Sequence, residues 1–145
     1  GLGDVYKRQG DIPFLKQVFA CMKAFIIDRE DLKQSMQVIV NVIREVRAGR
    51  NYLIFAEGTR SKNGNHPGTF KGGSFKTATK TKCPIVPVAL IDSFKAFDTG
   101  STEKITVQVH ILPPMYYEEY KDMHTTEIAE EVKRRIEKVI EENTI

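Results

Sequence analysis

Residues 51–61 read NYLIFAEGTRS, and this stretch is the most informative part of the chain for its fold. Its first half, residues 51–55, is a short apolar run suited to a buried strand, and a polar loop containing glycines follows up to residue 69. Open α/β sheets place ligand sites just beyond the carboxyl ends of their strands. A strand that runs directly into a Glu-Gly-Thr-Arg-Ser loop therefore predicts an α/β sheet with a site at this loop.

The sequence before this stretch predicts two helices and a strand. Residues 12–23 suit a short helix, and residues 24–28, AFIID, suit a buried strand. Residues 31–48 have the spacing of an amphipathic helix, and Gly49 follows as a stop. The apolar face expected for that helix comprises Leu32, Met36, Ile39, Val40, Ile43 and Val46.

The sequence after the loop continues the alternation of helices and strands. Residues 70–81 can open a helix, residues 85–90 form an apolar run, and residues 105–111 alternate as a strand that Pro113 and Pro114 end. A last helix begins near Thr125 or Thr126. We predict a single α/β domain with a mixed, largely parallel sheet flanked by helices. The apolar residues expected to face the core from the last helix are Ile128, Val132, Ile136, Val139 and Ile140.

Composition narrows the classes of protein that the chain can belong to. The chain has 145 residues, 41% hydrophobic and 28% charged, which is typical of one globular domain. Cys21 and Cys83 lack the spacing of a zinc site or a disulfide framework, and a reducing compartment fits them best. No apolar run approaches the roughly 18 to 20 residues that span a bilayer, although attachment to a membrane surface stays open.

The positive charge of the chain is concentrated in one stretch. Residues 58–91 contain no Asp or Glu, whereas the net charge of the whole chain is only +3. This local excess predicts an anion site or an anionic surface contact, and a solvated basic face is the simpler alternative. The six basic residues of the stretch are Arg60, Lys62, Lys71, Lys76, Lys80 and Lys82.

The residue types of the EGTRS loop suit phosphate binding. Gly58 lets backbone amides approach an anion closely, and Thr59 and Ser61 supply hydroxyl groups. Arg60 offers a planar fork that can hold a phosphate through two hydrogen bonds. Glu57 can orient such an arginine or accept a substrate hydroxyl. The simpler alternative is a polar turn in which Glu57 pairs with Arg60 and Ser61 caps the bend.

Several ordered segments together resemble one family. FAEGTRS at residues 55–61 is similar to the third conserved block of the glycerolipid acyltransferases, where proline usually stands at the position of Ala56. IIDR at residues 26–29 is similar to their second block, and IVPVAL at residues 85–90 to their fourth. Residues 12–15 and 70–76 resemble the segments that adjoin these blocks. The chain is most similar to the 1-acyl-sn-glycerol-3-phosphate acyltransferases, also called lysophosphatidic acid acyltransferases.

The resemblance implies a reaction and a set of site residues. Family members transfer a fatty acyl group from acyl-CoA or acyl carrier protein to the sn-2 hydroxyl of 1-acyl-glycerol 3-phosphate, which gives phosphatidic acid in phospholipid biosynthesis. Arg29 and Arg60 are then the expected phosphate ligands, with Lys71 as a further candidate. Neither a metal ion nor an organic cofactor is implied. Glu57, Gly58 and Thr59 are expected to shape the acceptor pocket, and Ile85, Val86, Pro87 and Val88 to line the acyl side or support the sheet.

The family's first block, a histidine with an aspartate five positions later, has no counterpart in this sequence. His66, His110 and His124 are followed at that spacing by Lys71, Met115 and Ala129. They fit better as a loop, a strand and a helix-start residue. We therefore assign no catalytic residue and expect a chain that is inactive alone.

The first ten residues, GLGDVYKRQG, show neither the family's pattern nor an evident structural role. We expect residues 1–10 to be a non-native or disordered leader. Residues 11–145 are then an acyltransferase domain that lacks its N-terminal elements.

The resemblance also implies partners and a location. The expected partners are lysophosphatidic acid, acyl-CoA or acyl carrier protein, and a membrane surface, with the chain peripheral at the cytoplasmic face of the cell membrane. An alternative is a non-catalytic module that binds anionic lipid or nucleic acid. Nucleic-acid binding is not expected, because only Phe70 and Phe75 interrupt the basic stretch with aromatic side chains.

Overall fold

The computed structural model describes residues 13–22, 24–25, 32–59, 61, 63–95 and 104–144, with only the backbone described at residues 13–16 and 32. The predicted leader at residues 1–10 and the IIDR segment at residues 26–29 lie outside these ranges. The chain divides into two compact units, Gly1–Ile54 and Phe55–Ile145. No helix within the described ranges combines the length and the apolar composition needed to cross a bilayer.

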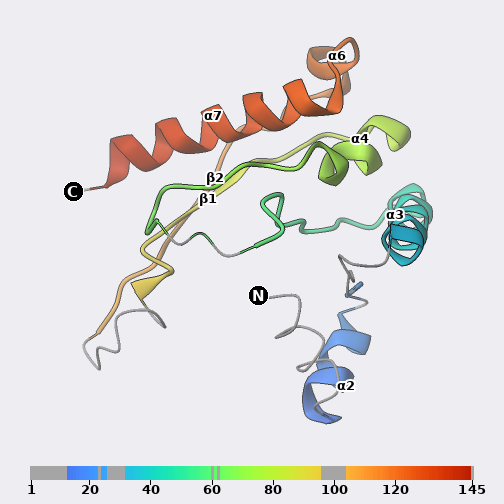
Figure 1. Ribbon diagram of the computed structural model, residues 1–145, viewed down its shortest axis with the longest axis horizontal. Helices are drawn as coiled ribbons and strands as arrows, with labels where there is room; N and C mark the ends of the chain where they lie inside the picture. The colour runs from blue at the N-terminus through green and yellow to red at the C-terminus, as the bar shows by residue number, and fades with distance from the viewer. Residues whose placement is uncertain are drawn as a thin grey trace. The chain divides into compact units, whose positions relative to one another are not determined.

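The first unit contains two helices, α2 (Pro13–Cys21) and α3 (Leu32–Arg47), which confirm both predicted helices (Figure 1). Proline suits the first position of α2, where its missing N–H removes no helical hydrogen bond. α3 stops as expected at Gly49, whose φ of +86° is the left-handed conformation that ends many helices. Arg44 and Arg47 in its last turn complement the helix dipole.

The predicted apolar face of α3 is only partly correct. The buried residues are Val38 and Val42, one turn apart, whereas Met36 and Val40 are 65% and 56% exposed. The run from residue 36 to residue 46 is so rich in apolar residues that more than one helical stripe satisfies the spacing rule. Which of these stripes is buried depends on tertiary packing, and the spacing of apolar residues carries no information about that packing.

Neither strand predicted for the first unit is found among the described residues. Residues 51–55 pair with no described strand, and Leu53 is 72% exposed. Tyr52 instead stacks on Phe25, with ring centroids 5.8 Å apart. Ala24 and Phe25 are irregular, and residues 26–28 of that predicted strand lie outside the described ranges. An apolar run specifies a tendency to be buried, but a strand also needs a hydrogen-bonded neighbour.

The second unit contains an antiparallel pair of strands, β1 (Val88–Ile91) and β2 (Gln108–Ile111). Val88 lies opposite Ile111 and Ile91 lies opposite Gln108, and an isolated bridge joins Ile85 to Met115. The predicted mixed, largely parallel sheet is not confirmed, because the sheet in the described residues is this antiparallel pair. The apolar pattern locates both strands, but it is compatible with either direction of pairing.

Helices complete the second unit. A 3₁₀ turn, η1 (Gly72–Phe75), leads into α4 (Lys76–Thr81), which confirms the helix predicted at residues 70–81. The short α6 (Tyr117–Tyr120) precedes α7 (Thr125–Asn143), which begins where it was predicted. Figure 1 shows α7 running along the β1–β2 pair, and α7 packs against both β1 and η1.

The core of the second unit lies between α7 and one face of the sheet. Ala89 and Ile91 of β1 are fully buried there, as are Met115 and Tyr120. Phe75 and Ala78 close the core from the η1–α4 side. Alternate residues along β1 are buried, as expected for a strand with one covered face. The predicted core residues of α7 are confirmed, with Ile128, Val132, Ile136 and Ile140 buried and Val139 partly buried against the cluster.

Candidate functional site

The EGTRS loop begins the second unit with a tight turn. The N–H of Gly58 donates to the carbonyl of Phe55 at 3.0 Å, and Gly58 has a φ of +64°. This left-handed conformation is one that glycine adopts without steric cost. Glu57 and Gly58 are half-buried, whereas Thr59 is exposed. Arg60 lies outside the described residues.

Three nested hydrogen bonds close the segment between residues 56 and 71. The outermost joins the N–H of Lys71 to the carbonyl of Ala56 at 2.9 Å. Within it, the N–H of Gly68 donates to Oε2 of Glu57 at 2.7 Å, and the hydroxyl of Ser61 donates to the carbonyl of His66 at 2.6 Å. The segment is therefore a closed loop, which is held at its base by hydrogen bonds within the segment itself.

Glycine at residue 68 leaves room for the middle hydrogen bond. A Cβ atom placed on Gly68 would lie 2.9 Å from Oε2 of Glu57, closer than real Cβ contacts allow. A side chain at residue 68 would therefore require the Glu57 carboxylate to shift from its present position. Gly68 was not among the predicted site residues, and the Pro-Gly pair at residues 67–68 was the available signal.

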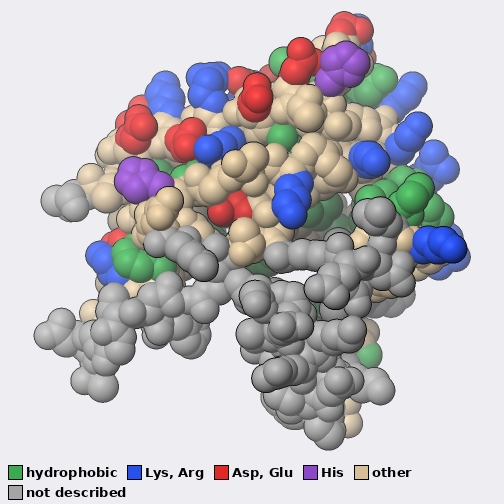
Figure 2. Space-filling model, viewed as in Figure 1, with side chains coloured by type: hydrophobic (Ala, Val, Ile, Leu, Met, Phe, Trp, Pro, Cys, Tyr) green, Lys and Arg blue, Asp and Glu red, His purple; other side chains and the backbone are tan. Residues whose placement is uncertain are grey.

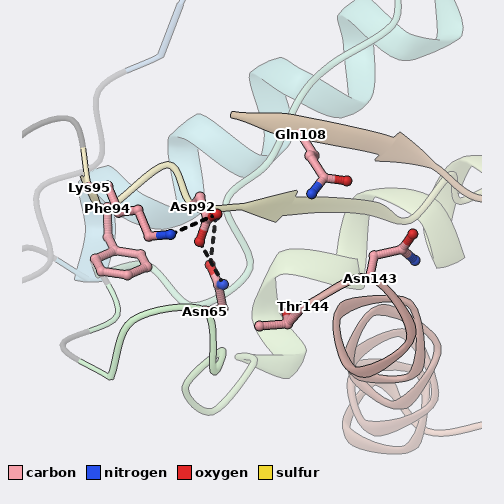
Figure 3. Close-up of a pocket in the computed structure, with 7 residues that line it drawn as sticks. All are labelled: Asn65, Asp92, Phe94, Lys95, Gln108, Asn143 and Thr144. Carbon is pink, nitrogen blue, oxygen red and sulfur yellow. Dashed lines mark hydrogen bonds and ion pairs between the residues drawn. The ribbon is translucent and has the colours of Figure 1, made fainter. Parts of the chain in front are cut away.

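The tip of the loop is attached to the end of β1. Nδ2 of Asn65 donates to Oδ1 of Asp92 at 3.0 Å, and the backbone N–H of Asp92 donates to Oδ1 of Asn65 at 2.7 Å (Figure 3). Nζ of Lys95 lies 2.9 Å from Oδ2 of Asp92. The Lys95 ammonium, and next the Asn65 amide, lower the pKa of Asp92 below its ordinary value. The sequence offered no local signal for this contact, because 27 residues separate Asn65 from Asp92.

A half-open pocket of about 380 Å³ adjoins this contact. Its wall combines the loop tip, the segment after β1, the start of β2 and the C-terminal end of α7 (Figure 3). The lining residues are Asn65, Asp92, Phe94, Lys95, Gln108, Asn143 and Thr144.

Of the three predicted phosphate ligands, the structure describes only Lys71. Lys71 is exposed and lies at the base of the closed loop, next to Ala56. The structure thus brings the backbone of Lys71 to Ala56, the residue just before the EGTRS segment. Arg29, like Arg60, lies outside the described residues.

Basic side chains lie along α4 and directly after it. Figure 2 shows Lys and Arg side chains gathered over the α4 end of the second unit. Lys76 and Lys80 of α4 are exposed, as is Lys82, whose Nζ lies 5.3 Å from the centre of the Tyr117 ring. The basic residues that follow the loop in sequence therefore face solvent, where an anion could reach them.

The predicted fourth-block residues belong to the sheet. Ile85 and Met115 exchange two backbone hydrogen bonds, at 2.9 and 2.7 Å. Pro87 is buried, and its carbonyl accepts the N–H of Leu112 at 3.0 Å. Val86 is 49% exposed, and Val88 is half-buried at the start of β1. These four residues thus lie at the start of β1 or just before it. Their role, in lining the acyl side or in supporting the sheet, stays a prediction.

The three histidines occupy the positions expected from the sequence. His66 lies in the closed loop, where its carbonyl accepts the Ser61 hydroxyl. His110 lies in β2, and its Nε2 is 3.0 Å from Oε1 of Gln108. His124 precedes α7, and its N–H donates to Oε2 of Glu127 at 2.6 Å. Each histidine thus has a local structural environment of its own.

Comparisons with known proteins identify relatives of the chain. A family model described as Acyltransferase matches residues 5–91. The chain is 30% identical to a 1-acyl-sn-glycerol-3-phosphate acyltransferase of Borreliella burgdorferi, over 88% of this chain and 53% of the relative. It is also 30% identical to the enzyme of that name from Helicobacter pylori, over 80% of this chain and 53% of the relative. A chloroplastic 1-acyl-sn-glycerol-3-phosphate acyltransferase of Brassica napus is 33% identical, over 72% of this chain and 31% of the relative.

The chain spans about half the length of the two bacterial relatives. No solved structure gives a significant match. The family model nevertheless covers more than half of the sequence, including the EGTRS loop, the closed segment around it and β1. The chain therefore belongs to the acyltransferase family.

Proposed function

We propose that the chain supplies the acceptor-phosphate side of an acyltransferase site. In this proposal the EGTRS loop holds the phosphate of 1-acyl-glycerol 3-phosphate, and the sn-2 hydroxyl receives a fatty acyl group, giving phosphatidic acid. The observation that carries the proposal is the closed loop, in which Ala56–Lys71, Glu57–Gly68 and Ser61–His66 hydrogen bonds join described residues of the family's motif to the segment that follows it. The names of the relatives support the choice of acceptor.

The charge around the loop suits a phosphate monoester. Residues 58–91 contain no acidic side chain, so the local potential attracts a dianion. Arg60 binds the phosphate through its guanidinium fork, and Arg29 and Lys71 add positive charge. Glu57, Gly58 and Thr59 shape the pocket around the glycerol. In this role Glu57 acts largely through the loop, because Oε2 is already bonded to Gly68.

The acyl step needs a group that this sequence does not contain. The acceptor oxygen attacks the thioester carbonyl of acyl-CoA or acyl carrier protein, its proton passes to a general base, and the thiol leaves as the ester forms. No histidine in the sequence has an aspartate five positions later. We therefore expect the 145-residue chain to bind the acceptor without transferring an acyl group. Release of free thiol by the purified chain would contradict this expectation.

The same proposal gives the chain a peripheral place at a membrane. Its acceptor is a lipid, so the basic residues near the loop also face anionic headgroups at the cytoplasmic surface. Competition separates this proposal from a nucleic-acid-binding module. Lysophosphatidate should remain bound when an oligonucleotide is added in excess.

The deciding experiment measures binding of 1-acyl-glycerol 3-phosphate by titration calorimetry. Arg60→Ala should weaken binding by about tenfold or more, because a charge-assisted, bidentate contact is lost. Lys76→Ala removes an exposed positive charge from the same stretch and is the matched control, with an expected change below about threefold. Monoacylglycerol, which has no phosphate, should not bind detectably. Equal affinity of the parent chain and Arg60→Ala would refute the proposal.

A further inference from the structure

The contact between Asn65 and Asp92 is reciprocal and bridges distant parts of the second unit. The Asn65 side chain donates to the Asp92 carboxylate and accepts the Asp92 backbone N–H. Both hydrogen-bonding atoms of the amide are thus used on one residue. Such a paired contact fixes the orientation of the amide as well as its position.

The backbone on both sides of this contact has uncommon conformations. Asp92 has a φ of +63°, which non-glycine residues seldom adopt, and Gly64, just before Asn65, has a φ of +62°. A Cβ atom on Gly64 would lie 3.5 Å from the ring of Phe94, so the loop tip also packs against the segment after β1. Conformations of this kind persist where surrounding contacts hold them in place.

The polar groups around the adjoining pocket bond to the protein itself. Nδ2 of Asn143 donates to the carbonyl of Val139 at 2.8 Å, and the Thr144 hydroxyl donates to the carbonyl of Ile140 at 2.7 Å. Asn65 and Lys95 both contact Asp92. Asn65 therefore joins the loop tip to the end of β1, and Lys95 joins the following segment to the same carboxylate. Asn143 and Thr144 bond to carbonyls of α7 itself. These partners within the protein favour a structural role for the pocket wall over a ligand-binding one.

The two anchors of the loop lie on either side of Arg60 in the sequence. Glu57 is attached to Gly68 at the base, and Asn65 is attached to Asp92 at the tip. Fixing both flanks of a short segment lowers the conformational entropy that it loses when it binds a ligand.

We propose that Asn65 and Asp92 are positioning residues, which hold the tip of the closed loop at the end of β1 so that the loop is preorganised for an acceptor phosphate. This inference rests on the proposed function for its ligand. That the contact holds the loop tip is a separate claim, which can be tested without any ligand.

An exchange of the two side chains tests the pair. Asn65→Asp alone places two carboxylates face to face and removes the donor of the side-chain bond. The double variant Asn65→Asp/Asp92→Asn restores one carboxylate and one amide with the roles reversed. Its carboxylate can accept both the backbone N–H at residue 92 and the new amide. A residue that acted only through its own packing would not be rescued in this way.

The first readout is hydrogen exchange measured by NMR on the ligand-free chain. Asn65→Asp should accelerate exchange of the Asp92 N–H by about tenfold or more, and the double variant should restore its protection. Amides of α7 serve as the internal control for global stability. Should Asn65→Asp also expose α7, Asn65→Ala replaces it as the single variant, because it removes the contact without introducing repulsion.

The second readout is the affinity for 1-acyl-glycerol 3-phosphate. The single variant should bind about tenfold more weakly, and the double variant should return to within about threefold of the parent chain. Unchanged exchange and affinity in the single variant would overturn the inference, as would failure of the double variant to recover. If the parent chain does not bind the lipid, the proposed function fails, while loss and recovery of exchange protection would still establish the anchor.

Discussion

Oε2 of Glu57 accepts the backbone N–H of Gly68 at 2.7 Å, across 11 residues of chain. This bond places an acidic residue of the family's motif in a structural role, as the closure of its own loop. A hydrogen bond to a charged acceptor is stronger than one between neutral groups, and here both partners are partly buried. Glu57, which was predicted to shape the acceptor pocket, therefore also bonds to the backbone 11 residues further along the chain.

Gly68→Ala should break this closure. The new methyl group would lie 2.9 Å from Oε2 of Glu57, so either the carboxylate or the backbone must move. We expect a loss of about 1 to 2 kcal/mol in the free energy of unfolding, together with weaker binding of lysophosphatidate. Urea denaturation followed by circular dichroism measures the first quantity.

Gly73→Ala is the matched control for this substitution. A Cβ atom on Gly73 would meet no atom within 4 Å, and Gly73 lies in η1 outside the closed loop. It should leave stability unchanged or raise it slightly, because alanine restricts the unfolded chain. Equal effects of the two substitutions would show that the Glu57–Gly68 bond contributes nothing measurable.

Local patterns in the sequence were sufficient to locate most of the helices. α7 begins at Thr125 as expected, because its apolar spacing and its hydrogen bonds are both local. Residues 51–55 show the opposite case. Their apolar character suggested a strand, but pairing depends on a partner distant in sequence, and none is found among the described residues.

The candidate site also has features that local sequence could predict and features that depend on distant contacts. The EGTRS motif could be recognised because its residues are adjacent. The Asn65–Asp92 pair could not be predicted, since it joins residues 27 positions apart. The Pro-Gly pair at residues 67–68 indicated a turn, but not the contact of Gly68 with Glu57, 11 residues away. A single sequence carries no direct information on which of several polar loop residues will meet.

Met115→Ala should be among the most destabilising single substitutions in the second unit. The Met115 side chain is fully buried in the core cluster, so truncation leaves a cavity as well as losing apolar burial. We expect a cost of about 2 to 5 kcal/mol. Met123→Ala is the control, because Met123 is 38% exposed and its truncation should cost less than about 1 kcal/mol. Denaturant midpoints for both variants provide the comparison, and similar midpoints would contradict the assignment of the core.

Tyr120→Phe should weaken the link between α6 and the end of α4. The buried hydroxyl of Tyr120 donates to the carbonyl of Cys83 and lies 3.3 Å from that of Ala78. Its removal leaves a carbonyl without this donor and should cost about 1 kcal/mol. Tyr117→Phe leaves the Tyr120 hydroxyl in place and is the matched control. An equal loss of stability in the two variants would show that the Tyr120 hydroxyl makes no specific contribution.

The same hydroxyl should make the protein sensitive to alkali. Burial raises the pKa of Tyr120 from 10.0 to about 12. Between these two values Tyr120 keeps its proton in the folded state and loses it in the unfolded state. The stability that the buried, protonated hydroxyl provides is therefore complete below pH 10.0 and is lost as pH rises towards about 12. Thermal unfolding of the parent chain should show a steeper decline across this range than that of Tyr120→Phe. Parallel declines would argue against a buried, protonated hydroxyl.

Glu131 should provide stability that acid removes. It accepts hydrogen bonds from Nε and Nη2 of Arg134, both at 2.8 Å, and from Nε of Arg135 at 2.7 Å. The Arg134 guanidinium, and next that of Arg135, lower the pKa of Glu131 from 4.5 to about 2. The contribution is therefore present above pH 4.5 and is lost as pH falls towards about 2.

Glu131→Gln should remove that part of the acid dependence. Because the cluster lies at the surface of α7, the loss at neutral pH should be below about 1 kcal/mol and should shrink further in high salt. Glu130→Gln, at an exposed position of the same helix, is the control and should leave the pH profile of the melting temperature unchanged. The difference in melting temperature between the parent chain and Glu131→Gln should therefore narrow as the pH falls from 4.5 towards about 2. A difference that stayed constant across this range would mean that the charge of Glu131 does not contribute to stability.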